Sequence, residues 1–367
     1  MGTRVDIIGW GGDGMAIVNA VVGVVARHED MWSVFRPSSE VSQLNATVRD
    51  AVRGDGTSRC GSDSAQAGPG LVVSEDTDRL LRGALALAEA TGGTFNPLIG
   101  PLVAAWDVKA MRAAYVAGVP LPPAPAADSV EAASRASSWG LLSRVGEQRW
   151  AMGVPAESVG GVDVPSPRLD LGGIAKGYTA DACRDLAVAM GARGILVSVG
   201  TSSVSVFGTR SDGSSWRAGL RDPHGGPTSV AGVVELPAGG MASLSTSGDN
   251  LGPLGGVGVG CAAERAAERA AGAASDRRAR ETPRETPGGG GRVFDHHIID
   301  PRTGYPAHAG VRQVSVVASS GVLAEALSTA LLVEPSIDVP DVVARWARVT
   351  GTPASAKVVG LVRAAQG

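Results

Sequence analysis

The sequence predicts an α+β fold, in which short strands form mainly antiparallel sheets and helices pack against them. The chain has 367 residues, of which 44% are hydrophobic, so there is enough apolar material for a substantial core. Helical and strand-like segments are mixed without the strict alternation of parallel α/β proteins. Several consecutive strand-like segments are separated only by turn-length gaps, which favours antiparallel pairing.

Two helices are predicted from apolar residues that recur at helical spacing. Residues 77–90 carry such a stripe and are followed by Gly92 and Gly93, which are typical residues after a helix end. Residues 175–190 repeat the pattern and are closed by Gly191. A third helix is predicted at residues 321–333, with Ser319 or Ser320 as its N-cap.

Strands are predicted where short apolar or alternating runs are bounded by Gly, Asp or Pro. These runs are residues 195–199, 203–207, 216–220, 230–236 and 313–318. Residues 5–8 form one more apolar run, followed by Gly9, Gly11 and Gly14. These glycines match the dinucleotide-binding pattern G-x-G-x-x-G, but no second βαβ unit follows, and a plain strand-to-helix turn is the preferred interpretation.

Composition excludes several classes of protein. The formal net charge is -3, with 33 Lys and Arg against 36 Asp and Glu, so nucleic-acid binding is not expected. Three scattered cysteines do not form a disulfide framework or a zinc pair. The longest apolar stretch, residues 15–26, is too short to span a bilayer and lacks the charged start of a signal peptide. We therefore expect a cytoplasmic protein, or an exported one if the start is truncated.

Residues 252–292 differ from the rest of the chain. They are rich in Gly, Ala and Arg, contain two short tandem duplications and carry few large apolar side chains. Such a segment cannot bury a core, and we interpret it as a low-complexity inserted loop. The expected organisation is a single domain over residues 1–367, with room for two lobes, that carries this insertion.

The most informative site candidate is the segment from Asp170 to Tyr178. It places glycines between a carboxylate and Lys176 at the predicted start of a helix. Backbone N–H groups, the helix N-terminus and the lysine could together bind a phosphate. The alternative is a glycine-rich turn with a surface lysine.

A second candidate is the segment from His296 to Gly304, where two histidines precede an Asp-Pro-Arg-Thr-Gly turn. A histidine there could transfer a proton or polarise a phosphate, although paired histidines can also arise without a function. The other histidines, at positions 28, 224 and 308, are interpreted as surface or core residues.

The predicted helix at residues 321–333 supplies a third candidate. Leu323, Leu327 and Leu331 form an apolar stripe, whereas Glu325, Ser328 and Thr329 share another face. A carboxylate and two hydroxyls are hard oxygen ligands that suit Mg²⁺, which keeps further positions for substrate oxygens. An ordinary amphipathic helix is the alternative.

Taken together, these motifs resemble the ApbE family of FAD:protein FMN transferases, over nearly the whole chain and in the family's order. The matching segments are residues 1–3, 33–45, 92–97 with 100–103, 170–178, 196–200, 245–249, 297–304 and 324–330. The resemblance implies a mixed α/β fold related to the T-fold. It also implies Mg²⁺-dependent transfer of FMN from FAD to a Thr or Ser hydroxyl of an acceptor flavoprotein, with release of AMP.

Two other activities are compatible with the resemblance. Some relatives instead hydrolyse FAD to FMN and AMP, and a degenerate member could bind FAD without turnover. The resemblance assigns the metal to the carbonyl of Gly173 with Glu325, Ser328 and Thr329, and catalysis to His297. It assigns FAD contacts to a set of eight residues. These are Met1, Phe35, Thr94, Phe95, Asn96, Asp170, Lys176 and Ile299.

The chain departs from the family's pattern at two places. Glu325 stands where the family usually has Asp, and the extra methylene is expected to loosen a site that Mg²⁺ requires to be nearly octahedral. Thr201 and Ser202 follow Gly200 where Gly and Asp are common. For the acceptance of the hydroxyl proton, His297 is preferred to Asp300, because an unperturbed histidine pKa lies near 6.5.

Overall fold

A six-stranded antiparallel sheet forms the centre of the molecule. The computed structural model describes residues 3–53, 70–117, 119–155, 161–223, 229–248 and 297–363. The sheet has the strand order β1-β5-β6-β9-β10-β11, and every neighbouring pair is antiparallel. Its strands are β1 Val5–Trp10, β5 Gly194–Val199, β6 Ser203–Gly208, β9 Met241–Gly248, β10 Val311–Ala318 and β11 Ala356–Arg363. The α+β prediction is confirmed.

Two smaller sheets accompany the central one. A three-stranded sheet has the order β2-β4-β3, and a two-stranded hairpin pairs β7 with β8. Their strands are β2 Leu71–Val72, β3 Leu142–Gly146, β4 Arg149–Met152, β7 Arg217–Arg221 and β8 Val230–Glu235. All of these pairs are also antiparallel.

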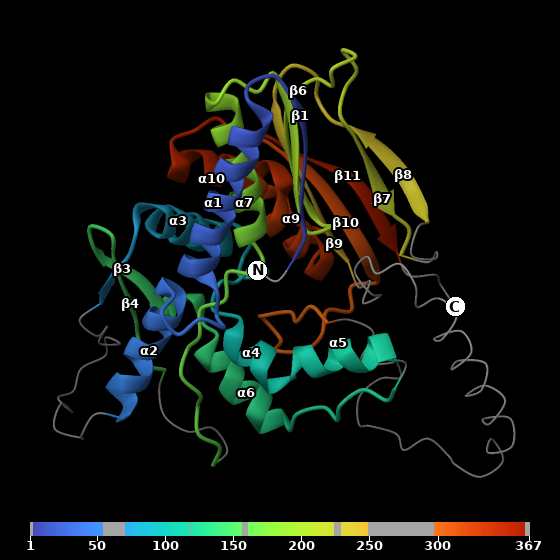
Figure 1. Cartoon of the computed structure of the whole chain (residues 1–367). Coiled ribbons are helices and arrows are strands. Elements are labelled where there is room, and N and C mark those ends of the chain that lie inside the picture. The colour runs from blue at the N-terminus through green and yellow to red at the C-terminus, as the bar shows by residue number, and fades with distance from the viewer. Residues whose placement is uncertain are drawn as a thin grey trace, which may run out of the picture.

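Helices cover one face of the central sheet and the hairpin lies on the other (Figure 1). On the helical face, α7 packs on β5 and β6, α9 packs on β9 and β10, and α1 packs on α7. On the opposite face, Trp216 and Leu220 of the hairpin region join Val206 and Leu244 of the sheet in one buried cluster. Both faces of the central strands are therefore buried.

The helices are α1 Gly14–Trp32, α2 Glu40–Arg53, α3 Glu75–Ala90, α4 Gly100–Ala105, α5 Val108–Ala117, α6 Ala127–Ala136, α7 Ala175–Ala189, α9 Gly321–Val333 and α10 Val339–Thr350. Of these, α3, α7 and α9 lie within two residues of the bounds that the sequence predicts, whereas α2, α4, α5, α6 and α10 were not predicted. A short 3₁₀ helix, Trp139–Leu141, precedes β3. None of the helices in the described part of the chain is long and apolar enough to cross a bilayer.

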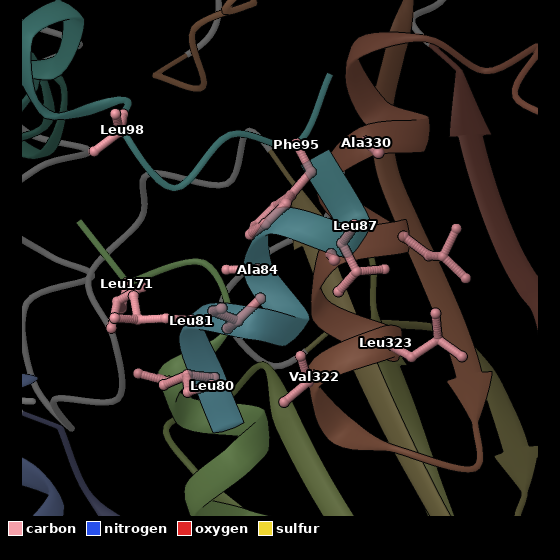
Figure 2. Close-up of a cluster of buried hydrophobic side chains, with 14 of the residues drawn as sticks. Leu80, Leu81, Ala84, Leu87, Phe95, Leu98, Leu171, Val322, Leu323 and Ala330 are labelled. Atoms are coloured by element: carbon pink, nitrogen blue, oxygen red, sulfur yellow. The ribbon is translucent and has the colours of Figure 1, made fainter. Parts of the chain in front are cut away.

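The largest core lies between α3, α9 and β10. Figure 2 shows residues of this cluster on both helices, Leu80, Leu81 and Leu87 on α3 and Val322 and Leu323 on α9, and all five are buried. The i, i+3, i+4, i+7 spacing of apolar residues in α3 produces this face. This core anchors α9, the helix on which the predicted metal ligands Glu325, Ser328 and Thr329 lie.

Helices α4 and α6 form a separate layer with the segment 297–307 (Figure 1). The segment doubles back on itself, with a bridge between Ile299 and Pro306. Gly304 has a φ of 78° in this turn, and its carbonyl accepts a 2.7 Å hydrogen bond from Trp106 Nε1. The predicted Asp-Pro-Arg-Thr-Gly turn is thus present and is held against α4.

The fold bears on three further sequence predictions: the glycine pattern after the first strand, the serine N-cap of α9 and the insertion. Gly9 lies in β1, Gly11 lies in the turn between β1 and α1, and β1 is an antiparallel edge strand, as the preferred interpretation required. Ser320 occupies the N-cap position of α9, as predicted, although its side chain makes no capping hydrogen bond. The predicted insertion at residues 252–292 lies outside the described residues.

Candidate active site

The candidate site is built where helices α7 and α9 cross. Gly177 of α7 and Gly321 of α9 touch through their backbones: a Cβ atom on Gly177 would lie 2.3 Å from the Gly321 oxygen. A Cβ atom on Gly321 would lie 2.4 Å from the Gly177 oxygen. Only glycine permits this approach, because any side chain at either position would overlap the other helix's backbone. The contact brings the Asp170–Tyr178 motif against the predicted metal-binding face of α9.

Glu325 lies one turn after this crossing and is buried, with 3% of its surface exposed. One carboxylate oxygen, Oε2, accepts a 2.7 Å hydrogen bond from the Gly177 backbone N–H, one of the N–H groups in the first turn of α7 that have no partner within the helix. The other, Oε1, accepts a 2.6 Å hydrogen bond from Ser203 Oγ on β6. The carboxylate is thus oriented by two donors from two different elements.

Lys176 completes the surroundings of this carboxylate. Its Nζ lies 3.0 Å from Glu325 Oε1 and donates a 3.0 Å hydrogen bond to the Gly172 carbonyl. The Lys176 side chain is 26% exposed and that of Glu325 is 4% exposed, so the pair lies at the boundary between core and solvent. The Lys176 ammonium thus bridges the Glu325 carboxylate and the Gly172 carbonyl, so these oxygens already bind a positive charge.

Serine and threonine hydroxyls continue the polar face beyond Glu325. Ser247 Oγ on β9 lies 2.8 Å from Ser328 Oγ and 3.0 Å from Thr329 Oγ1. Ser328 Oγ also lies 3.2 Å from Ser245 Oγ. The predicted shared face of Glu325, Ser328 and Thr329 is confirmed, and it points toward β9.

The oxygen atoms of this polar face have the chemistry that Mg²⁺ requires of its ligands. Glu325, Ser328 and Thr329 offer hard oxygen atoms, and the exposed backbone of Gly173 lies at the mouth of α7. A Cβ atom on Gly173 would lie 3.4 Å from the ring of Phe95. The residues present therefore fit the ion, although no cluster of three or more His, Cys, Asp or Glu side chains occurs among the described residues.

The loop from Thr91 to Pro97 lies against the Asp170 motif. The Asp170 backbone N–H donates a 2.8 Å hydrogen bond to the Pro97 carbonyl, and the Asp170 side chain accepts one of 2.8 Å from Gly172 N–H. The fold thus brings two of the predicted FAD-contact segments together.

The three predicted FAD contacts in this loop have buried side chains. The Thr94 hydroxyl donates to the Thr91 carbonyl at 2.9 Å. The Asn96 side chain donates to the Ser137 carbonyl at 2.6 Å and accepts from Leu98 N–H at 2.8 Å. Thr94 and Asn96 thus shape the loop that holds Phe95 beside Gly173, and their contact with FAD stays a prediction.

Phe35 is the predicted FAD contact with the most open surroundings, since 83% of it is exposed. Its neighbour in the chain, Val34, lines a cavity of about 540 Å³. Other lining residues are Asn45, Pro101 and Arg168. The described lining of this cavity includes none of the predicted metal ligands, so the cavity adjoins the Glu325 centre without containing it. Met1, another predicted contact, lies outside the described residues.

His297, Ile299 and Asp300 lie on the segment that packs on α4. His297 is half-buried, and Ile299 is buried in the apolar cluster that includes Leu102 and Trp106. Asp300 accepts hydrogen bonds from Arg302 Nε at 3.1 Å and from Arg302 Nη2 at 3.0 Å. Both oxygens of Asp300 are thus engaged by the Arg302 guanidinium, and the role of His297 as proton acceptor stays a prediction.

Sequence reasoning missed a second carboxylate at this helix crossing, that of Asp181 of α7, whose side chain is 16% exposed. Its Oδ1 accepts hydrogen bonds from Ser205 Oγ and Ser243 Oγ, both at 2.6 Å, and its Oδ2 accepts one of 2.6 Å from Gly321 N–H. Burial raises the pKa of Asp181, against the opposing effect of Arg184 and the two serines. The available signal was the alternation of serines along β6 and β9.

Comparison with known proteins decides the family. The model of the ApbE family matches residues 1–252 and 285–350, most of the chain. The chain belongs to the ApbE family. A curated FAD:protein FMN transferase of Treponema pallidum is 32% identical over 278 residues, 74% of this chain and 63% of the relative. One from Rhodobacter capsulatus is 28% identical over 333 residues, 91% of this chain and 49% of the relative.

Solved structures of the ApbE family share the fold. The flavin transferase ApbE from Vibrio cholerae superposes with a TM-score of 0.62 at 20% identity, covering 100% of this chain and 94% of the other. The ApbE protein of Thermotoga maritima gives 0.61 at 23% identity, with 99% and 94% covered. This ApbE chain spans about half to two thirds of the length of these curated relatives and of one from Salmonella typhimurium.

Proposed function

We propose that the chain transfers FMN from FAD to a Thr or Ser hydroxyl of an acceptor flavoprotein, in a Mg²⁺-dependent reaction that releases AMP. The observation that carries the proposal is the Lys176–Glu325 pair at the glycine-rich mouth of α7. There, positive charge and backbone N–H groups at a helix N-terminus lie beside hard oxygen donors, as binding of a pyrophosphate with its cation requires. The names of the curated relatives support the same reaction.

In the proposed reaction, the acceptor hydroxyl attacks the FMN phosphorus of FAD. An oxygen–phosphorus bond forms to the acceptor, the bond to the bridging pyrophosphate oxygen breaks, and AMP leaves. His297 would accept the hydroxyl proton, and Lys176 would stabilise the charge that develops on the phosphate oxygens. Gly173, Glu325, Ser328 and Thr329 would hold Mg²⁺, which when bound neutralises pyrophosphate charge.

The test is an incubation of the full chain with FAD, Mg²⁺ and a flavin-free acceptor whose native form carries FMN on Thr or Ser. Transfer gives a fluorescent acceptor band and AMP. AMP and free FMN without a labelled acceptor would instead show FAD pyrophosphatase activity, and bound FAD without AMP would show a non-catalytic binder. Either result would refute the transferase proposal.

Two variants test the assigned roles. We expect His297→Ala to lose transfer by about 100-fold, the usual contribution of a positioned acid or base. His308→Ala is the matched control, because His308 is an exposed histidine in the same segment. Full transfer by His297→Ala would refute the proton-acceptor role, and Mg²⁺-dependent turnover by Glu325→Gln would refute the metal assignment.

A further inference from the structure

Helices α7 and α9 begin with the same short pattern, and each caps the other. Gly177 is followed four residues later by Asp181, and Gly321 is followed four residues later by Glu325, with Ala before the acid in both cases. Glu325 Oε2 accepts from Gly177 N–H at 2.7 Å, and Asp181 Oδ2 accepts from Gly321 N–H at 2.6 Å. Each carboxylate therefore satisfies an unpaired N–H at the start of the opposite helix, where negative charge is stabilised by the helix dipole.

We propose that Asp181 is a positioning residue for the metal face of α9. By fixing the first N–H of α9, Asp181 sets where the helix starts against α7, and this sets the position of Glu325 one turn later. The inference deepens the proposed function and rests on it. Asp181 itself touches none of the predicted metal ligands in the described contacts; it acts through Gly321 and the sheet.

The contacts of Asp181 come from four separate places in the fold. Besides Gly321 of α9, its donors are Ser205 of β6, Ser243 of β9 and Arg184 of α7, whose Nη1 lies 3.0 Å away. A largely buried carboxylate is stable only when its oxygens are satisfied in this way. Movement of α9 relative to α7 or to the sheet would break at least one of these bonds, so the set resists such movement.

Strand β6 couples the two carboxylates. Ser203 and Ser205 are two residues apart, so they share one face of the strand. Ser203 donates to Glu325 and Ser205 donates to Asp181, both at 2.6 Å. Because one rigid strand orients both acids, loss of the Asp181 contacts is expected to displace the donors that hold Glu325.

The first experiment measures binding of Mn²⁺, an oxygen-preferring substitute for Mg²⁺, to the full chain by electron paramagnetic resonance at a temperature where every variant is folded. We expect Asp181→Asn to raise the Mn²⁺ dissociation constant about 10- to 100-fold, as is usual for residues that orient a metal ligand. Asp185→Asn is the matched control: Asp185 lies one turn further along α7, is exposed and pairs with Arg184 at 2.8 Å. A merely structural Asp181 would lower the melting temperature and leave this constant unchanged in the folded protein.

A second measurement does not need the metal. Hydrogen–deuterium exchange should become at least about 10-fold faster at the start of α9 in Asp181→Asn, and unchanged there in Asp185→Asn. If Asp181→Asn does not fold, Ser205→Ala removes one donor to Asp181 and should show the same two effects more weakly.

The outcomes separate the two proposals. If the parent chain shows no Mn²⁺ site that Glu325→Gln removes, the proposed metal site is wrong, and exchange at the start of α9 alone decides the role of Asp181. If the parent binds Mn²⁺ through Glu325 while Asp181→Asn and Ser205→Ala bind it equally well, the positioning role is overturned.

Discussion

Replacement of Gly177 by alanine should separate the two helices that build the site. The added Cβ atom would lie 2.3 Å from the Gly321 oxygen, whereas ordinary contacts begin near 3.4 Å, so the backbones must move apart by about 1 Å. Overpacking of this kind costs about 1–3 kcal/mol. Weakening the hydrogen bond from Gly177 N–H to Glu325 adds about 1.5–3 kcal/mol. Alanine returns about 1 kcal/mol through its helix propensity.

The net loss for Gly177→Ala is therefore about 1.5–5 kcal/mol, which for a chain of 367 residues corresponds to a fall in melting temperature of about 2–7 °C. Thermal unfolding followed by circular dichroism measures it. Gly23→Ala is the matched control, because Gly23 lies in α1 with nothing within 4 Å of its Cβ position. It should stabilise the chain by about 0.5–1 kcal/mol. A Gly177→Ala variant that melts with the parent would refute the close-contact argument.

Three further predictions concern other parts of the chain. Phe35→Ala should weaken FAD binding by about 10-fold in a fluorescence titration without changing the melting temperature, because the exposed ring stabilises no core. Burial lowers the pKa of His28 to about 4, against the raising effect of Asp76. The stability that neutral His28 contributes should therefore be lost as pH falls from 6.5 toward 4. His28→Gln should flatten this part of the pH profile of the unfolding free energy, measured with urea. The pKa of Asp78 is lowered because hydrogen bonds from Arg144 and Trp150 outweigh its desolvation. The difference in unfolding free energy between the parent and Asp78→Asn should therefore be constant near neutral pH. It should shrink only as pH falls below about 4.

Local patterns were sufficient for helices α3, α7 and α9 and for six strands of the described part of the chain. The apolar stripe of α3 and the glycines after it fixed that helix to within two residues of its observed start. The face shared by Glu325, Ser328 and Thr329 follows from helical spacing alone, and α9 has the predicted bounds. These features depend on residues a few positions apart, which a sequence displays directly.

Long-range partners could not be predicted in the same way. Alternating serines in β6 indicate a strand with one face in solvent, the usual arrangement in antiparallel sheets. In the structure both faces are buried, and Ser203 and Ser205 instead face two carboxylates on helices. The start of α9 shows the same limit: Ser320 occupies the predicted N-cap position, but the Gly321 N–H is bound by Asp181, 140 residues earlier in the chain.

The two departures from the family's sequence pattern are linked through Ser203, which follows one in the chain and contacts the other. Glu325 is longer than the usual Asp by one methylene, about 1.5 Å, and both of its oxygens are engaged, by Gly177 N–H at 2.7 Å and Ser203 Oγ at 2.6 Å. Ser203 directly follows the other departure, Thr201 and Ser202, at the start of β6. A shorter aspartate at position 325 could not span the same two donors without movement of α9. The longer side chain is therefore held in place by Ser203, and the loosening expected from its length is opposed by contacts from α7 and β6.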